Sequence, residues 1–407
     1  MSYFPEVAIK AADSPSIDAF SRLRVSSPVG IFDAQFTYNL NNLLFEQITN
    51  GSGATITHDS TNRQAAMEFS STPTGGKAYM QSYEYFRYQP GKSQLIFVTF
   101  NFIEAQANVL KFAGYSDGVN GIEFQQDGST VQMKILSATS KGNETVAQAD
   151  WNIDKMNGLG PSGLTLNLTK MQILVIDLQA LYVGRVRVGF DIGGNVHYVH
   201  EFNHANLDDS PYIQTANLPV RCGMTCTGTV STTMKFICSS VISEGGMENT
   251  NGRTFGVESI GQAGNQTRVH LLSIRPKTTF NGITNRVKFE LQSLQIGNTS
   301  SALILWELVL GQAITGTTTF SDCNPTYSAF EYNSAGAISG SPAIVLASGY
   351  IGQSSGSGSD TRHLVARYPI TLDAAGAVRP LGTLSVLATA SGPNGNCRTT
   401  LNWAEIR

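Results

Sequence analysis

The stretch Gly121-Ile-Glu-Phe-Gln-Gln-Asp-Gly-Ser-Thr-Val-Gln-Met-Lys-Ile135 decides the fold. Apolar and polar residues alternate on both sides of Asp127-Gly128, a dipeptide that favours the tight turn of a β-hairpin. A period of two places every second side chain on the same face of a strand. The stretch therefore predicts two antiparallel strands joined by a short turn.

The same pattern recurs along the chain. It predicts strands at 94–102, 121–125, 130–135, 171–178, 185–192, 196–202 and 233–242, and again at 269–274, 286–296, 302–310, 381–387 and 399–406. No segment has a convincing helical period, beyond one short turn at 178–182. The predicted fold class is therefore all-β, with two antiparallel β-sandwiches of the jelly-roll or lectin-like kind.

A change in composition predicts where the two sandwiches meet. Residues 245–264 are rich in Gly, Asn and Gln, which is typical of a break between domains. We therefore expect an extended N-terminal arm (1–34), a larger sandwich (35–245), a linker (246–264) and a second sandwich (265–407).

The N-terminal arm has the features of a docking segment. Pro15 and Pro28 each bias the preceding residue toward extended geometry. Apolar residues alternate with charged ones, so the segment buries itself poorly alone. The residues we expect to dock on a neighbouring protein are Phe20, Arg22, Leu23, Arg24, Val25 and Phe32. The alternative is that the arm packs as an edge strand on its own sandwich.

Composition excludes some partners and some chemistry. The 407 residues include 27 Lys and Arg and 30 Asp and Glu, a net charge of −3, so neither nucleic acid nor an anionic membrane is an expected partner. No apolar run reaches the roughly 18 residues of a transmembrane helix. Five cysteines without a recognisable secretion signal are expected as reduced thiols, and no cofactor is expected.

Three groups of residues are candidate sites. His197, His200 and His204 resemble metal ligands, but strand geometry puts the first two on opposite faces. The run Asn206–Asp209 offers oxygens for Ca²⁺, yet a solvated turn is the simpler interpretation. Tyr83, Tyr85, Phe86 and Tyr88 could stack on sugars, or could be core residues. No catalytic motif is visible, so we expect no metal site and no catalytic residues, although separated carboxylates of a glycosidase remain open.

Several segments resemble one family of tailed-bacteriophage virion proteins. They are 88–93 (Tyr-Gln-Pro-Gly-Lys-Ser), 151–156, 160–165, 176–179, 183–190, 200–206, 217–221, 243–246, 274–277 and the closing Leu-Asn-Trp-Ala-Glu-Ile-Arg at 401–407. The resemblance covers nearly the whole chain. It departs from the family pattern at 180–182, where this chain has Ala-Leu-Tyr in place of Trp-Leu-Gly. The family implies a location in the virion and supplies no active site.

These observations lead to one expected function and two alternatives. The chain is expected to be a non-enzymatic structural protein of a phage particle, made in the host bacterial cytoplasm and docked on the head or tail through its arm. Its expected partners are copies of itself and other virion proteins. The first alternative is a receptor-recognition module that binds a host-surface glycan. The second is a polysaccharide depolymerase.

Overall fold

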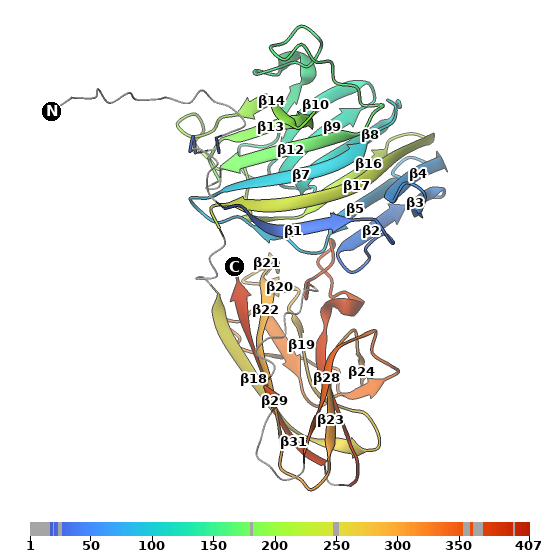
Figure 1. The fold of residues 1–407 in the computed structure, drawn as a ribbon, viewed down its shortest axis with the longest axis vertical. Coiled ribbons are helices and arrows are strands. Elements are labelled where there is room, and N and C mark those ends of the chain that lie inside the picture. Colours follow the sequence, from blue (N-terminus) through green and yellow to red (C-terminus); the bar gives the residue numbers. More distant parts are fainter. Residues whose placement is uncertain are drawn as a thin grey trace, which may run out of the picture. The chain divides into compact units, whose positions relative to one another are not determined.

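The computed structural model describes residues 17–18, 20–22, 27–179, 182–246, 252–352, 359–360, 369–393 and 395–407. The chain divides into two compact units, Met1–Met247 and Glu248–Arg407 (Figure 1). Strands dominate both units, and the regular helical structure in the described residues is two short 3₁₀ turns, η1 (Gln148–Asp150) and η2 (Pro380–Gly382). The predicted all-β fold class is confirmed.

The first unit is a sandwich of two antiparallel sheets. One sheet runs in the order β14 (Asn195–Phe202), β13 (Val186–Ile192), β12 (Gln172–Gln179), β7 (Ser93–Asn101), β17 (Val230–Glu244), β4 (Gln64–Thr72) and β3 (Ala54–Asp59), with β1 (Val29–Gln35) also paired to β17. The other runs β11 (Glu144–Ala147), β10 (Thr130–Leu136), β9 (Gly121–Asp127), β8 (Val109–Ser116), β16 (Val220–Cys226), β5 (Lys77–Ser82) and β2 (Phe45–Asn50). A small pair, β6 (Phe86–Arg87) and β15 (Asn217–Leu218), lies outside both.

An aromatic core fills the space between these two sheets. Phe100, Phe102 and Phe124 contact one another from strands and loops of both layers, with ring centroids 4.3 to 5.7 Å apart. Each of the three is fully buried. Burying a phenylalanine side chain contributes roughly 1.5–3 kcal/mol, so this cluster is a main source of stability in the unit.

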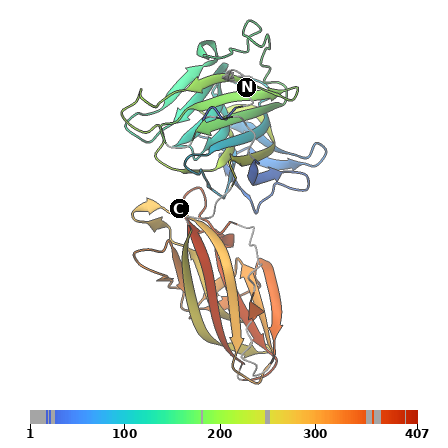
Figure 2. The same cartoon turned by 60° about the vertical axis from the view of Figure 1, so that its left-hand side comes forward.

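The second unit is built from a ten-stranded arrangement. Its order is β25 (Ser321–Asp322), β26 (Phe330–Asn333), β19 (Val269–Pro276), β30 (Leu384–Ala390), β18 (Arg253–Asn265), β31 (Gly395–Ile406), β22 (Lys288–Asn298) and β29 (Ser359–Asp360), with β23 (Ile304–Leu310) paired to β30 and β28 (Ile344–Ile351). Two small pairs accompany it, β20 (Thr279–Phe280) with β21 (Ile283–Thr284), and β24 (Ala313–Thr315) with β27 (Ala337–Ser339). Figure 2 shows the long strand β31, in red, at the centre of its sheet.

Two segments differ from the organisation read from the sequence. Residues 246–264, expected as a linker, contain most of β18, which pairs with β31 along eleven registered positions. The glycines of that strand gave it the composition of a loop, while Val257 and Ala263 bury their side chains in the core. At the other end, β1 begins at Val29, inside the expected arm.

The five cysteines carry no disulfide. Cys222, Cys226 and Cys397 are buried, and Cys238 and Cys323 are partly buried. Cys222 and Cys226 both point into the core of the first unit because they lie four residues apart on β16. No helix among the described residues is long and apolar enough to span a membrane.

Candidate functional site

The outer face of one sheet in the first unit carries an unusual set of side chains. On β9, Ile122 and Phe124 enter the core, so Glu123 and Gln125 between them point to the other face. The strand register then aligns further residues across the sheet in two rows. We call this set the polar face: Tyr79, Gln81, Phe112, Glu123, Gln125, Gln132 and Arg221.

Arg221 is the centre of the polar face. Its guanidinium carbon lies 4.2 Å from the ring centroid of Tyr79 and 4.8 Å from that of Phe112. A cation held against two aromatic faces is attracted by both ring quadrupoles. Its side chain is 14 % exposed, so the group is held in place yet reachable from solvent.

Two glycines make room for this arrangement. A Cβ on Gly223 would meet the Cβ of Tyr79 at 2.1 Å, so only glycine lets that side chain cross β16. A Cβ on Gly118, in the loop after β8, would meet a terminal nitrogen of Arg221 at 2.2 Å. Gly118 also has a φ of +87°, which favours glycine for a second reason.

A chain of hydrogen bonds fixes the carboxylate beside Arg221. Gln132 donates from Nε2 to Oε1 of Gln125 at 2.9 Å, and Gln125 donates from Nε2 to Oε2 of Glu123 at 2.7 Å. Ser116 donates its hydroxyl to the other carboxylate oxygen, Oε1. That same oxygen lies 3.8 Å from a terminal nitrogen of Arg221. Buried polar groups that are satisfied in this way are rigid, and so present a fixed pattern of donors and acceptors.

The docking residues expected in the arm are distributed differently. Phe32 is on β1 and is buried in the core, 4.7 Å from Phe86 and 5.8 Å from Phe45 between ring centroids. Arg22 forms an ion pair with Asp18 at 2.7 Å and lies over the ring of Phe20. Leu23, Arg24 and Val25 lie outside the described residues.

Part of the arm contacts its own sandwich. Ile17 is buried, and its carbonyl accepts a hydrogen bond from Arg187 at 2.8 Å. Arg187 is itself a buried cation, paired with Asp177 at 2.6 Å and stacked on Tyr198. Asp177 also accepts a hydrogen bond from the hydroxyl of Tyr198 at 2.8 Å. This buried group therefore ties Ile17 to β12, β13 and β14.

The aromatic run chosen from the sequence as a sugar platform is mainly interior. Tyr85, Phe86 and Tyr88 are buried, whereas Tyr83 is half-buried. The aromatic residues of the polar face are instead Tyr79, which is half-buried, and Phe112, which is buried beside Arg221, and they lie on strands that are far apart in sequence. No local pattern marks those two residues, because only the pairing of β5, β16 and β8 brings them together.

The structure places the three histidines considered as metal ligands in different surroundings. A bulge at Val199 interrupts the pairing of β13 with β14, and His200 accepts a hydrogen bond from the backbone of Asn152 at 3.2 Å. His197 is partly exposed farther along the same strand. His204 follows the strand and meets Asp208 and Glu144, a residue that the sequence analysis did not select.

Comparisons with known proteins leave the family open. No family model matches the chain, and no curated protein matches it. Solved structures do match about half of it. A putative β-glucanase from Mycobacterium abscessus is 11 % identical, with 52 % of this chain and 100 % of that one covered, at a TM-score of 0.36. A glycosyl hydrolase family 16 protein from Mycobacterium smegmatis is 13 % identical over 52 % and 100 % of the two chains, at 0.34.

A carbohydrate esterase from the Shiga toxin-encoding bacteriophage phi24B also matches. It is 10 % identical over 53 % of this chain and 99 % of that one, with a TM-score of 0.31. Because all these TM-scores are low, the matches assign no function to this chain. The resemblance to a phage virion family is not confirmed by these matches, although this one of them is a phage-encoded protein.

One expectation is corrected at this point. The chain was expected to be non-enzymatic, and this expectation is wrong as stated. The matching structures include glycosyl hydrolases and one from a study of endo-acting O-glycanases. The expectation of a non-enzymatic protein rested on the absence of a catalytic motif in the sequence. Catalytic groups that converge from separate strands leave no such motif.

Proposed function

We propose that the first unit binds a carbohydrate chain across its polar face. The observation that carries the proposal is the Arg221 guanidinium held between Tyr79 and Phe112, beside the linked side chains of Glu123, Gln125 and Gln132. The partly exposed ring of Tyr79 offers an apolar surface to the C–H face of a sugar. Amide, carboxylate and guanidinium groups offer planar donors and acceptors to the hydroxyls.

The extent of the polar face suits an extended ligand. Each of its two rows crosses five neighbouring strands, and one of them runs from Gln81 through Arg221, Gly114 and Glu123 to Lys134. Neighbouring strands lie about 4.8 Å apart, so the row is about 19 Å long. An elongated row of fixed polar groups favours a chain of several sugar units over a single monosaccharide.

Glycan-array screening followed by titration calorimetry on the full chain tests this proposal. We expect Gln132→Ala to weaken binding about tenfold, because it removes a partly exposed amide and frees Gln125 from its fixed orientation. Gln106→Ala is the matched control: this partly exposed glutamine lies in the loop between β7 and β8, outside the polar face. Equal affinity in the Gln132 variant and the wild type, or no glycan bound at all, would contradict the proposal.

Glu123 is the carboxylate of this face that cleavage of a bound chain would use, but the two other carboxylates considered on the same sheet lie too far from it to form a glycosidase pair. This carboxylate is 3 % exposed and is held by donors on both oxygens. Glycosidases usually place two carboxyl groups roughly 5 to 9.5 Å apart. Glu46 lies four strands away from Glu123 across the sheet, which is about 19 Å by strand spacing. Asp127 lies four residues away from Glu123 along the same strand, which is about 13 Å. Release of reducing ends in the same samples, lost in Glu123→Gln, separates cleavage from binding.

Association with a phage particle is a separate proposal. It is supported by the family resemblance of the sequence and by Arg22, whose side chain is 51 % exposed near the start of the described chain. We expect the protein to be found in purified particles by mass spectrometry. Presence only in the lysate of infected cells would end this proposal and would leave the glycan proposal untouched.

A further inference from the structure

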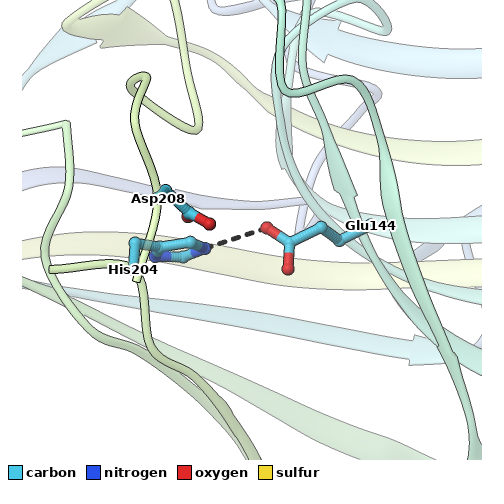
Figure 3. A group of neighbouring side chains, drawn as sticks. All are labelled: Glu144, His204 and Asp208. Atoms are coloured by element: carbon cyan, nitrogen blue, oxygen red, sulfur yellow. Dashed lines mark hydrogen bonds and ion pairs between the residues drawn. The ribbon is translucent and has the colours of Figure 1, made fainter. Parts of the chain in front are cut away.

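One cluster of metal-ligating side chains lies away from the polar face, where two loops meet. The backbone N–H groups of Leu207 and Asp208 both donate to the carbonyl of His204 at 3.0 Å, and Asn206 adopts a φ of +65°. This tight turn brings the Asp208 side chain beside the His204 ring. Glu144, the first residue of β11, faces them from the other loop (Figure 3).

The His204 ring is held in one orientation. Nδ1 lies 2.9 Å from the carbonyl of Gly184, and since a carbonyl only accepts, Nδ1 carries a hydrogen. The ring stacks on Tyr212 with centroids 4.2 Å apart and its side chain is fully buried. Nε2 is thereby aimed at Oε1 of Glu144, 3.0 Å away. A histidine that donates one nitrogen to a carbonyl and presents the other is the usual arrangement of a metal-binding imidazole.

The two carboxylates around Nε2 need positive charge. A neutral imidazole would direct its Nε2 lone pair at the Glu144 carboxylate, which is unfavourable without a proton or a metal ion between them.

Lys141 supplies part of that charge. Its ammonium lies 2.7 Å from Oδ1 of Asp208 and 3.3 Å from Oε1 of Glu144. The second oxygen of Asp208, Oδ2, is buried without a hydrogen-bond partner. One ammonium thus faces two carboxylates and leaves one of their buried oxygens unsatisfied. A divalent cation would balance both charges.

We propose that Glu144, His204 and Asp208 bind a divalent first-row transition ion of the zinc class, with Lys141 displaced from between the carboxylates. The three ligand atoms lie within 4.8 Å of one another. Zinc bonds to nitrogen and oxygen are about 2.0–2.2 Å, so a small inward movement of the side chains completes the site. One imidazole nitrogen with two carboxylates favours Zn²⁺ or Mn²⁺, whereas Ca²⁺ takes oxygen ligands alone.

The bound ion would join two segments at the edge of the sheet that carries the polar face. Glu144 begins the edge strand β11, and His204 with Asp208 belongs to the segment after β14. A hydrogen bond from the Thr139 hydroxyl to the carbonyl of Pro211, 2.7 Å long, links the same two loops. The ion is therefore expected to hold this edge of the sheet in place, independently of any glycan.

Titration of the chelator-treated full chain with ZnCl₂, MnCl₂, CaCl₂ and MgCl₂ at neutral pH tests the site. We expect one Zn²⁺ per chain that is lost, or weakened at least tenfold, in Asp208→Asn. Asp209→Asn is the matched control, since the next residue is exposed and outside the cluster. Circular dichroism and the thermal transition of each variant show that it is folded.

A second variant keeps the test decisive if Asp208→Asn fails to fold. Lys141→Met removes the competing cation, and we expect it to bind Zn²⁺ at least ten times more tightly than the wild type. Zinc binding that is equal in Asp208→Asn and the wild type, or lost equally in Asp209→Asn, would overturn the proposal. So would the absence of Zn²⁺ binding in both the wild type and Lys141→Met.

Discussion

At the scale of single residues, the buried polar side chains of this protein are placed by partners from distant parts of the chain. His270 on β19 is an example. Its Nδ1 lies 3.0 Å from the carbonyl of Gly336 and its Nε2 lies 2.8 Å from the hydroxyl of Ser273, which in turn is 2.6 Å from that of Ser385. These partners fit a neutral imidazole, which donates from one nitrogen and accepts at the other.

The burial of His270 leads to a prediction about pH. Burial lowers the pKa of His270, outweighing the opposing hydrogen bond to Gly336. The folded chain then holds the neutral form below pH 6.5, where the unfolded chain takes up a proton. The stability that this residue contributes is thus complete above pH 6.5 and is lost as pH falls toward its folded pKa.

Urea unfolding at pH 7.5 and pH 5.5 checks this effect. We expect the second unit to lose stability between the two values by at most about 1.4 kcal/mol per pH unit for this residue, and His270→Gln to lose less. His58→Gln, in the first unit, should leave the pH dependence of the second unit unchanged. An unchanged pH slope in His270→Gln would show that another group is responsible.

At the scale of elements, β1 decides how the N-terminal segment is understood. Its residues pair with β17 from Val29↔Ser243 to Gln35↔Cys238, with one irregularity after Gly30. Alternation puts Phe32 and Ala34 into the core, while Asp33 and Gln35 are exposed. Asp33, one of the charged residues that gave this segment the pattern of an exposed arm, is therefore on the outward side of a strand.

Substitution of two phenylalanines shows which part of the N-terminal segment belongs to the core and which part is free to dock on a partner. We expect Phe32→Ala to cost about 3–5 kcal/mol of unfolding free energy, because Phe32 is packed against Phe45 and Phe86. Phe20→Ala is the comparison, and we expect it to cost under about 1 kcal/mol because Phe20 is only partly buried. Denaturant unfolding measures both. Similar costs for the two variants would mean that residue 20 also belongs to the core.

At the scale of the whole molecule, the two units share a type of architecture but differ in the residues of their cores. Each is a strand sandwich around its own apolar core, the first lined by phenylalanines and the second by Trp306, Trp403 and aliphatic residues. The polar face and the Glu144–His204–Asp208 cluster both belong to the first unit. We therefore expect ligand and metal effects on stability to appear in the unfolding of that unit.

Local sequence determined much of the strand pattern. The hairpin of β9 and β10 was predicted from alternation and from Asp127-Gly128, because the turn and the two periods involve only neighbouring residues. The expected strands at 94–102, 185–192 and 399–406 correspond to β7, β13 and β31 for the same reason. β18 was missed because its glycines resemble a linker until the neighbouring strands are present.

Tertiary structure alone decided both candidate sites. Tyr79, Phe112, Glu123 and Arg221 come from β5, β8, β9 and β16, whose order in the sheet is β9-β8-β16-β5. Glu144 meets His204 across sixty residues of sequence. Strand pairing over such separations is set by the total burial of both sheet faces, and no local period records it. The sequence by itself determined that the chain forms sheets, and the packing of those sheets determined which polar groups meet.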